Sequence, residues 1–186
     1  ARALLEHGAD EAGHAAQRLD DLGLAGEAEV LEAVELGGLD LVQLVVAAQQ
    51  QQEEALARLR KHFKLVTMTN AQTWALQHFQ KTLGSPFDLL LACDDALCEK
   101  PDARYFAYAR GRFEGAWGYK QADNLHVAQS QYHDIGISKK LGITTCWIER
   151  RHGLASSGGT IESEHTVPDY HFHTLAQLAD AVDAGQ

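Results

Sequence analysis

The chain has 186 residues, of which 45% are hydrophobic and 23% charged, and its formal net charge is −10. That size and composition are typical of one soluble globular domain. The negative charge would repel nucleic acids and anionic membranes, so we expect neither as a partner and expect a small molecule instead. No stretch approaches the roughly 18 uncharged apolar residues of a membrane span, and no signal-peptide pattern opens the chain, which predicts a cytoplasmic protein.

Three cysteines occur in the chain, at Cys93, Cys98 and Cys146. They form neither a CxxC metal pair nor an even-numbered disulfide framework. We expect each to act as a small buried hydrophobic residue rather than as a nucleophile.

The composition changes abruptly at Phe63. Residues 1–62 contain no Phe, Trp, Tyr or Pro and form an atypical segment rich in Ala, Leu and Glu. Helices are predicted over 3–22 and 49–62, and the apolar run 36–46 fits either a strand or a buried helix. Another hypothesis is that this segment is mispredicted or fused sequence in place of the natural N-terminus, and expression of the chain from Leu56 onward would test it.

From residue 63 to the end, β-type runs alternate with helical ones, which predicts an α/β core over 63–186. Strands are predicted at 64–70, 87–93, 124–128, 144–149 and 170–173, and helices at 71–83, 101–113, 133–141 and 175–184. Such alternation implies right-handed crossovers and a parallel sheet. Ligands bind such sheets at the carboxyl ends of the strands.

Polar residues follow three of these predicted strands: Thr69 and Asn70, then Lys100, then Ser130 and Asp134. Hydroxyl and amide groups beside a helix start can bind an anion, and a lysine there can neutralise one. Each group also has a structural explanation, because Thr, Asn, Ser and Asp are common helix caps and most lysines are solvated. Singly, none of them predicts a function.

In this order, however, they resemble motifs two, three and four of the haloacid dehalogenase (HAD) superfamily. The resemblance rests on Thr69-Asn70, on Lys100-Pro101-Asp102, and on Ser130 and Asp134 followed by residues 140–148, and it spans about two-thirds of the chain. The tail through residues 147–151 is most similar to the 2-haloacid dehalogenase branch. The resemblance implies a Rossmannoid three-layer α/β core with a parallel sheet.

The resemblance also implies a mechanism. In that superfamily an aspartate at the end of the first strand attacks the substrate, and water hydrolyses the resulting ester. By resemblance, Thr69 and Asn70 would bind the anionic group of a small substrate, and Lys100 would offset the charge of the nucleophile. Ser130 and Asp134 would order the lysine and the attacking water.

The first motif and the cap domain of the family have no recognisable counterpart. Asp40 is the nearest candidate nucleophile, but no hydroxyl residue stands four positions later. In the family the first strand lies between the motif-two and motif-four strands, so its loss would leave two strand edges unpaired. We predict a surrogate strand at 39–46; otherwise the core would be open, unstable or joined into a homo-oligomer through these edges.

Some residues depart from the family pattern. Gln129 stands where Mg-dependent phosphatases carry a carboxylate, so no cofactor is expected, with Mg²⁺ needed only if the protein is phosphatase-like. Phe106 takes the place of a family tyrosine, with Tyr105 one position earlier. His171 and His173 can share one strand face, but no third ligand is visible in the sequence, so no metal site is predicted.

Three functions remain open from the sequence. The first is a HAD-type hydrolase, haloacid dehalogenase-like, acting on a small anionic substrate. The second is a Mg-dependent phosphatase of the same fold. The third is a truncated or non-catalytic HAD-like domain whose pocket binds anions or a partner chain.

Overall fold

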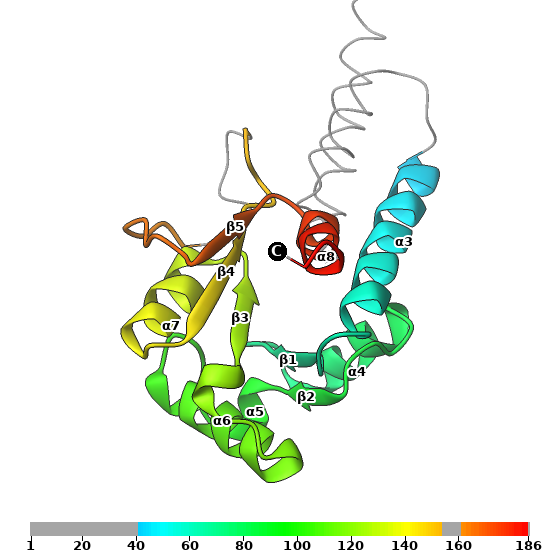
Figure 1. Cartoon of the computed structure of the whole chain (residues 1–186). Coiled ribbons are helices and arrows are strands. Elements are labelled where there is room, and N and C mark those ends of the chain that lie inside the picture. The colour runs from blue at the N-terminus through cyan, green and yellow to red at the C-terminus, as the bar shows by residue number, and fades with distance from the viewer. Residues whose placement is uncertain (1–40, 154–160, 186) are drawn as a thin grey trace, which may run out of the picture. The chain divides into compact units, whose positions relative to one another are not determined.

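The computed structural model describes residues 41–153 and 161–185 (Figure 1). The chain divides into two compact units, one of residues 1–50 with 150–159 and one of residues 51–149 with 160–186. The account below concerns the second unit, which holds all the strands described. The boundary predicted at residue 63 from composition stays a prediction.

The strand predicted at 39–46 is wrong for the residues that can be compared. Helix α3 (Leu41–Leu59) includes residues 41–46, and residues 39 and 40 lie outside the described part of the chain. The physical reason is the sequence that follows. Ala, Gln, Glu and Leu continue to Leu59 without Gly or Pro, and cooperative propagation over 19 residues outweighs the strand preference of three valines.

The first pair of strands forms a small parallel sheet. Strand β1 pairs with β2 in the register Val66↔Leu89 to Met68↔Leu91. Helices α4, α5 and α6 follow these strands. The elements of this part are β1 (Val66–Met68), α4 (Thr73–Thr82), β2 (Leu89–Leu91), α5 (Cys93–Ala96) and α6 (Ala103–Trp117).

The second group of strands forms a parallel sheet in the order β3-β4-β5. The predicted α/β class with parallel strands is therefore confirmed. The remaining elements are η1 (Gln121–Asp123), β3 (Leu125–Ala128), the π-helical turn η2 (Gln131–Ile135), α7 (Gly136–Lys140), β4 (Thr144–Ile148), β5 (Tyr170–Phe172) and α8 (Leu175–Asp183).

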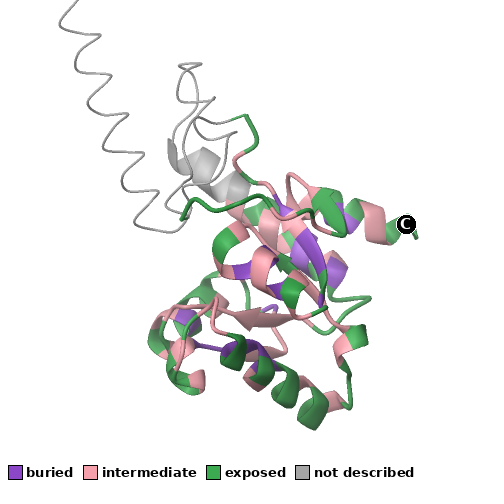
Figure 2. Cartoon of the chain, turned by 90° about the vertical axis from the view of Figure 1, so that its left-hand side faces the viewer, coloured by how far each residue is buried: buried purple, intermediate pink, exposed green. Residues whose placement is uncertain are grey.

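Two hydrophobic clusters of buried residues lie beside the two sheets, and Figure 2 colours the chain by how far each residue is buried. One cluster joins α3, β4 and α8 through Leu59, Cys146 and Leu178. The other joins β2 and α6 through Leu91 and Tyr105. Leu65, just before β1, also packs against the first cluster.

The place between β1 and β3 is not filled by any strand of the described residues. Among these residues, β1 pairs only with β2, and β3 pairs only with β4. Leu65 and Thr69 bond to β2 through their backbone, so the backbone groups of Val66 and Met68 face the opposite edge, because successive residues of a strand alternate. Within the part of the chain that the structure describes, the sheet is therefore incomplete, as predicted, and a homo-oligomer joined through these edges stays a prediction.

Within the described ranges, no helix combines the length and the apolar character needed to cross a membrane.

Candidate active site

Asn70 fixes the backbone that carries Lys100. Its Nδ2 donates to the Lys100 carbonyl oxygen at 3.0 Å, and the Lys100 N–H donates to Asn70 Oδ1 at 2.7 Å. Because the amide makes both of these bonds, Asn70 connects the end of β1 to the start of α6. The structure gives Asn70 a positioning role in addition to the predicted substrate contact.

Thr69 lies beside it at the end of β1. Its Oγ1 accepts a hydrogen bond from the Ala71 N–H at 3.1 Å, which leaves the hydroxyl proton for another acceptor. Thr69 is half-buried at the carboxyl end of the strand. This geometry is compatible with donation to an anionic ligand.

Lys100, Asp134 and His126 form a nearly buried cluster. Lys100 Nζ donates to Asp134 Oδ1 at 2.6 Å, and His126 Nε2 lies 2.9 Å from the same oxygen. The three side chains are only 11%, 6% and 12% exposed. Three separate elements therefore meet here: the start of α6, the turn η2 and strand β3.

The electrostatics of the cluster keep Asp134 ionised. Burial alone would raise the pKa of this carboxyl group, but the hydrogen bond with His126 and the charge of Lys100 outweigh it. The net effect is a pKa for Asp134 below its usual value. A carboxylate at this position holds the ammonium group of Lys100 in one place.

Ser130 is the N-cap of η2. Its Oγ accepts from the His133 N–H at 3.0 Å and lies 3.1 Å from His133 Nδ1. Among the described hydrogen bonds, Ser130 makes none to Lys100. It orients the turn that carries Asp134, and its predicted contact with water stays a prediction.

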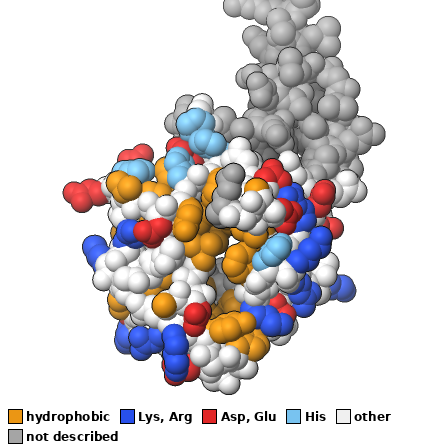
Figure 3. Space-filling view, in the orientation of Figure 1, with side chains coloured by type: hydrophobic (Ala, Val, Ile, Leu, Met, Phe, Trp, Pro, Cys, Tyr) orange, Lys and Arg blue, Asp and Glu red, His pale blue; other side chains and the backbone are white. Residues whose placement is uncertain are grey.

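The cluster lines a cavity of about 610 Å³ at the gap between β1 and β3. Its apolar wall includes Val66, Met68 and Phe106. Figure 3 shows hydrophobic side chains gathered around a hollow on this face. The place where the sheet is open is therefore also the place where the candidate site lies.

Charged side chains of both signs line the cavity. Its lining includes four Lys or Arg side chains but only two carboxylates, although the whole chain has a charge of −10. The basic residues are Lys64, Lys100, Arg110 and Lys120, and the acidic ones are Asp123 and Asp134. Lys64, Lys100 and Lys120 each form an ion pair, with Asp88, Asp134 and Glu114 respectively, so the positive charges of the lining are largely offset by neighbouring carboxylates.

The described residues of this site do not by themselves fit a Mg²⁺ ion. Magnesium takes several oxygen ligands and usually one or two carboxylates. Here the single carboxylate in the cluster, Asp134, shares one oxygen between Lys100 and His126, and the neighbouring Gln129 offers a neutral amide. No group of three metal-binding side chains occurs around Asp134 in the described ranges.

The two neighbouring aromatic residues, Tyr105 and Phe106, lie in different surroundings. The Tyr105 hydroxyl lies in the core, 2.8 Å from the carbonyl oxygens of both Thr69 and Leu91. Phe106 lines the cavity, and its ring lies 5.4 Å from that of His126. Phe106, where the sequence predicted the loss of a hydroxyl group, is thus part of the apolar wall.

His126 is the residue of this cluster for which no role was predicted. It lies on β3 and reaches Asp134, eight residues later, because η2 turns back over the end of the strand. The sequence offered one weak indication of this contact, a histidine on a strand that is followed by a turn containing an aspartate.

Comparison with known proteins gave matches only among solved structures. No family model and no curated protein matches the chain. The putative HAD-hydrolase YfnB from Bacillus subtilis, in a magnesium-bound crystal form, is 18% identical with a TM-score of 0.57, and the match covers 95% of this chain and 83% of that one. The L-2-haloacid dehalogenase from Xanthobacter autotrophicus is 20% identical with a TM-score of 0.55, covering 87% and 75%.

A third match is the HAD phosphatase from Thermococcus onnurineus, at 21% identity and a TM-score of 0.57, covering 85% of this chain and 71% of that one. This chain has the haloacid dehalogenase-like fold. The resemblance predicted from Thr69, Lys100 and Asp134 is confirmed at the level of the fold. Solved structures with this fold are named as dehalogenases and as phosphatases. The fold therefore does not decide between the two activities, and the residues of the site have to.

Proposed function

We propose that this protein is a hydrolase of the haloacid dehalogenase type that acts on a small anionic substrate. The observation that carries the proposal is the buried pair of Lys100 and Asp134, which presents a fixed ammonium group at a cavity of about 610 Å³. A fixed positive charge in a site of low water content stabilises negative charge far better than one in bulk water.

Each residue has a separate role in this proposal. Lys100 offsets negative charge on the nucleophile and substrate, and Asp134 with His126 holds the ammonium group. Asn70 fixes the backbone of Lys100. The Thr69 hydroxyl, which accepts from the Ala71 N–H, would donate its proton to the anionic group of the substrate.

The proposed reaction requires a carboxylate that attacks the substrate carbon and displaces the leaving group, after which water hydrolyses the ester. Within the described ranges, Asp134 is the carboxylate that Lys100 contacts, and its Oδ1 is bound by both Lys100 and His126. Asp40, the nearest candidate in the sequence, lies outside the described residues.

The side chains available to bind a metal ion favour dehalogenation over phosphate hydrolysis. The cluster lacks the carboxylates that a Mg²⁺ ion needs, and Gln129 does not replace them. Displacement at carbon by a carboxylate needs a positive charge but no metal ion.

The test is to incubate the full chain with 2-haloacids and with phosphate monoesters and to measure halide and phosphate release, with Mg²⁺ or with EDTA. We expect halide release that EDTA does not affect and that Lys100→Ala lowers about 10²–10³-fold. The matched control is Lys140→Ala, because Lys140 is exposed and does not line the cavity.

Two results would contradict the proposal. Phosphate release that depends on Mg²⁺ would support the phosphatase. Release of neither product by folded protein would support a non-catalytic domain, and calorimetric titration with a 2-haloacid would then report whether the cavity still binds anions.

A further inference from the structure

The ends of β4 and β5 bring together a second group of ionisable side chains, formed by Glu149, His171 and His173. The register of the strands explains why. Trp147 pairs with His171, and the Glu149 N–H donates to the Phe172 carbonyl oxygen just past the end of β4. Since side chains alternate along strands, Glu149, His171 and His173 share one face of the sheet.

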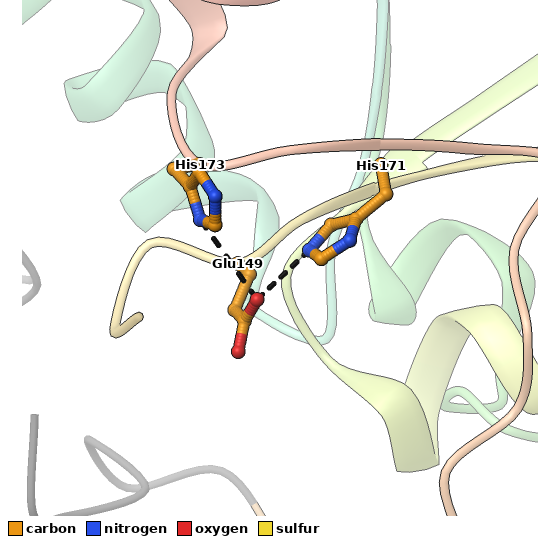
Figure 4. Close-up of side chains that lie close together, drawn as sticks. All are labelled: Glu149, His171 and His173. Atoms are coloured by element: carbon orange, nitrogen blue, oxygen red, sulfur yellow. Dashed lines mark hydrogen bonds and ion pairs between the residues drawn. The ribbon is translucent and has the colours of Figure 1, made fainter. Parts of the chain in front are cut away.

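The atoms that could bind a metal are close to one another. His171 Nε2 lies 2.8 Å from Glu149 Oε2, and His173 Nδ1 lies 3.8 Å from the same oxygen. All three candidate ligand atoms lie within 4.8 Å of one another. Figure 4 shows both imidazole rings turned toward the carboxylate.

These distances agree with what a tetrahedral zinc ion requires. Bonds of about 2.0–2.2 Å from zinc to His nitrogen and carboxylate oxygen place the ligand atoms about 3.3 Å apart. The two measured distances, 2.8 and 3.8 Å, lie on either side of that value. Small side-chain rotations would therefore suffice, with no change in the strands.

The surroundings support a built site. The Trp147 ring stacks on His171 with centroids 4.6 Å apart and planes 19° apart, and Trp147 Nε1 donates to the Gln129 carbonyl oxygen at 2.8 Å. This arrangement limits the rotation of His171 and lowers the entropy lost when a metal binds. The side chains of His171 and Glu149 are 42% and 26% exposed, which leaves a path for an ion from solvent.

We infer that Glu149, His171 and His173 form a binding site for one divalent transition-metal ion, with Zn²⁺ the best match. Two imidazoles and one carboxylate suit zinc and its neighbours and not magnesium or calcium, which prefer oxygen ligands alone. Three protein ligands leave a further coordination position for water or another ligand. This site does not depend on the proposed hydrolase activity, because it shares no residue with the Lys100 cluster.

The competing explanation is a hydrogen-bonded surface group with no ion, and calorimetric titration of the full chain with ZnCl₂ separates the two. We expect one Zn²⁺ per chain with micromolar or tighter affinity. Glu149→Gln, His171→Ala and His173→Ala should each weaken binding at least 10-fold. The matched control is His165→Ala, because His165 also contacts the Trp147 ring, at 5.1 Å, but is outside the cluster.

A second measurement gives the position of the ion. Co²⁺ is paramagnetic, so its binding should quench the fluorescence of Trp147, one of three tryptophans. Trp147→Phe should keep the stoichiometry of one and lose most of this quenching. The inference is overturned if wild-type protein binds no Zn²⁺, if the three ligand variants bind as wild type does, or if His165→Ala weakens binding equally.

Discussion

The Lys100 Nζ and the Asp134 Oδ1 lie 2.6 Å apart although 34 residues separate them, and neither side chain is more than 11% exposed. Two buried charges of opposite sign stabilise each other only while both are present. Removal of one partner leaves an uncompensated charge away from water, which costs more than the pair contributes.

The first prediction concerns this pair. Asp134→Ala should destabilise the fold by about 3–5 kcal/mol in urea unfolding, because it leaves the Lys100 ammonium buried without its partner. Lys100→Met should cost less, since Asp134 would still be bound to His126. The double variant Lys100→Met with Asp134→Ala should lose less than the sum of the two single losses.

The control for that cycle is Lys139→Met at a more exposed ion pair with Asp169, where both side chains are about one-third exposed. It should cost under about 1 kcal/mol. Equal losses from the two lysines, or strictly additive losses in the double variant, would show that Lys100 and Asp134 do not form a coupled buried pair.

Acid sensitivity follows from the lowered pKa of Asp134. The pKa of an aspartate in the unfolded chain is about 3.9. Below that pH the unfolded state therefore binds a proton more readily than the folded state does. The stability that Asp134 contributes is complete above about pH 4 and is lost as the pH falls through the lower folded pKa. Asp134→Asn should flatten this part of the stability curve, and an unchanged acid limb would contradict the assignment.

Asp169 should also make the protein less stable in acid, by a smaller amount than Asp134 does. Hydrogen bonds from Lys139 and Thr145 hold its pKa at about 2, so its contribution is lost between about pH 4 and pH 2. Its side chain is 35% exposed, so solvent screening limits the contribution to about 1 kcal/mol or less. Asp169→Asn should lower stability at pH 7 and have little effect at pH 2, as measured by thermal unfolding at both values.

Tyr105 gives a test of the buried hydrogen bonds that support the backbone at the ends of β1 and β2. Tyr105→Phe removes a buried hydroxyl group from the carbonyl oxygens of Thr69 and Leu91 and should cost about 1–2 kcal/mol. Tyr108→Phe is the matched control on the same helix, because the Tyr108 hydroxyl accepts from Arg112 at the exposed surface. Its effect should stay within about 0.5 kcal/mol. A loss as large for Tyr108 as for Tyr105 would contradict this account.

Much of the fold after residue 63 could be predicted because local patterns determine it. Short apolar runs such as the one that ends at Leu91 form strands, and Gly84 ends α4 as expected with a positive φ of 71°. The order of Lys100 and Asp134 predicted their meeting, because strand ends of a parallel sheet share one edge.

The errors arose where residues beyond a short stretch of sequence decide the structure. The run at 41–46 has strand-type residues, but its continuation into α3 makes it helical, which a short window does not show. Glu149 was missed as a companion of His171 because the pairing register of β4 with β5 is a tertiary property. His126 was missed for a similar reason, since the fold of η2 over β3 brings it to Asp134.

Cys146 should be unreactive for as long as the protein is folded. It is fully buried in the cluster that joins β4 to α3 and α8, and burial raises the pKa of its thiol to about 12. At pH 8 only about one thiol in 10⁴ would be ionised, and the side chain is also out of contact with solvent. A disulfide reagent should therefore modify at most two of the three thiols in the native state, Cys93 and Cys98, and the third only after denaturation. Cys146→Ala should remove the late-reacting thiol and leave the early ones unchanged, and three thiols of equal reactivity in native protein would show that β4 does not form the centre of this core.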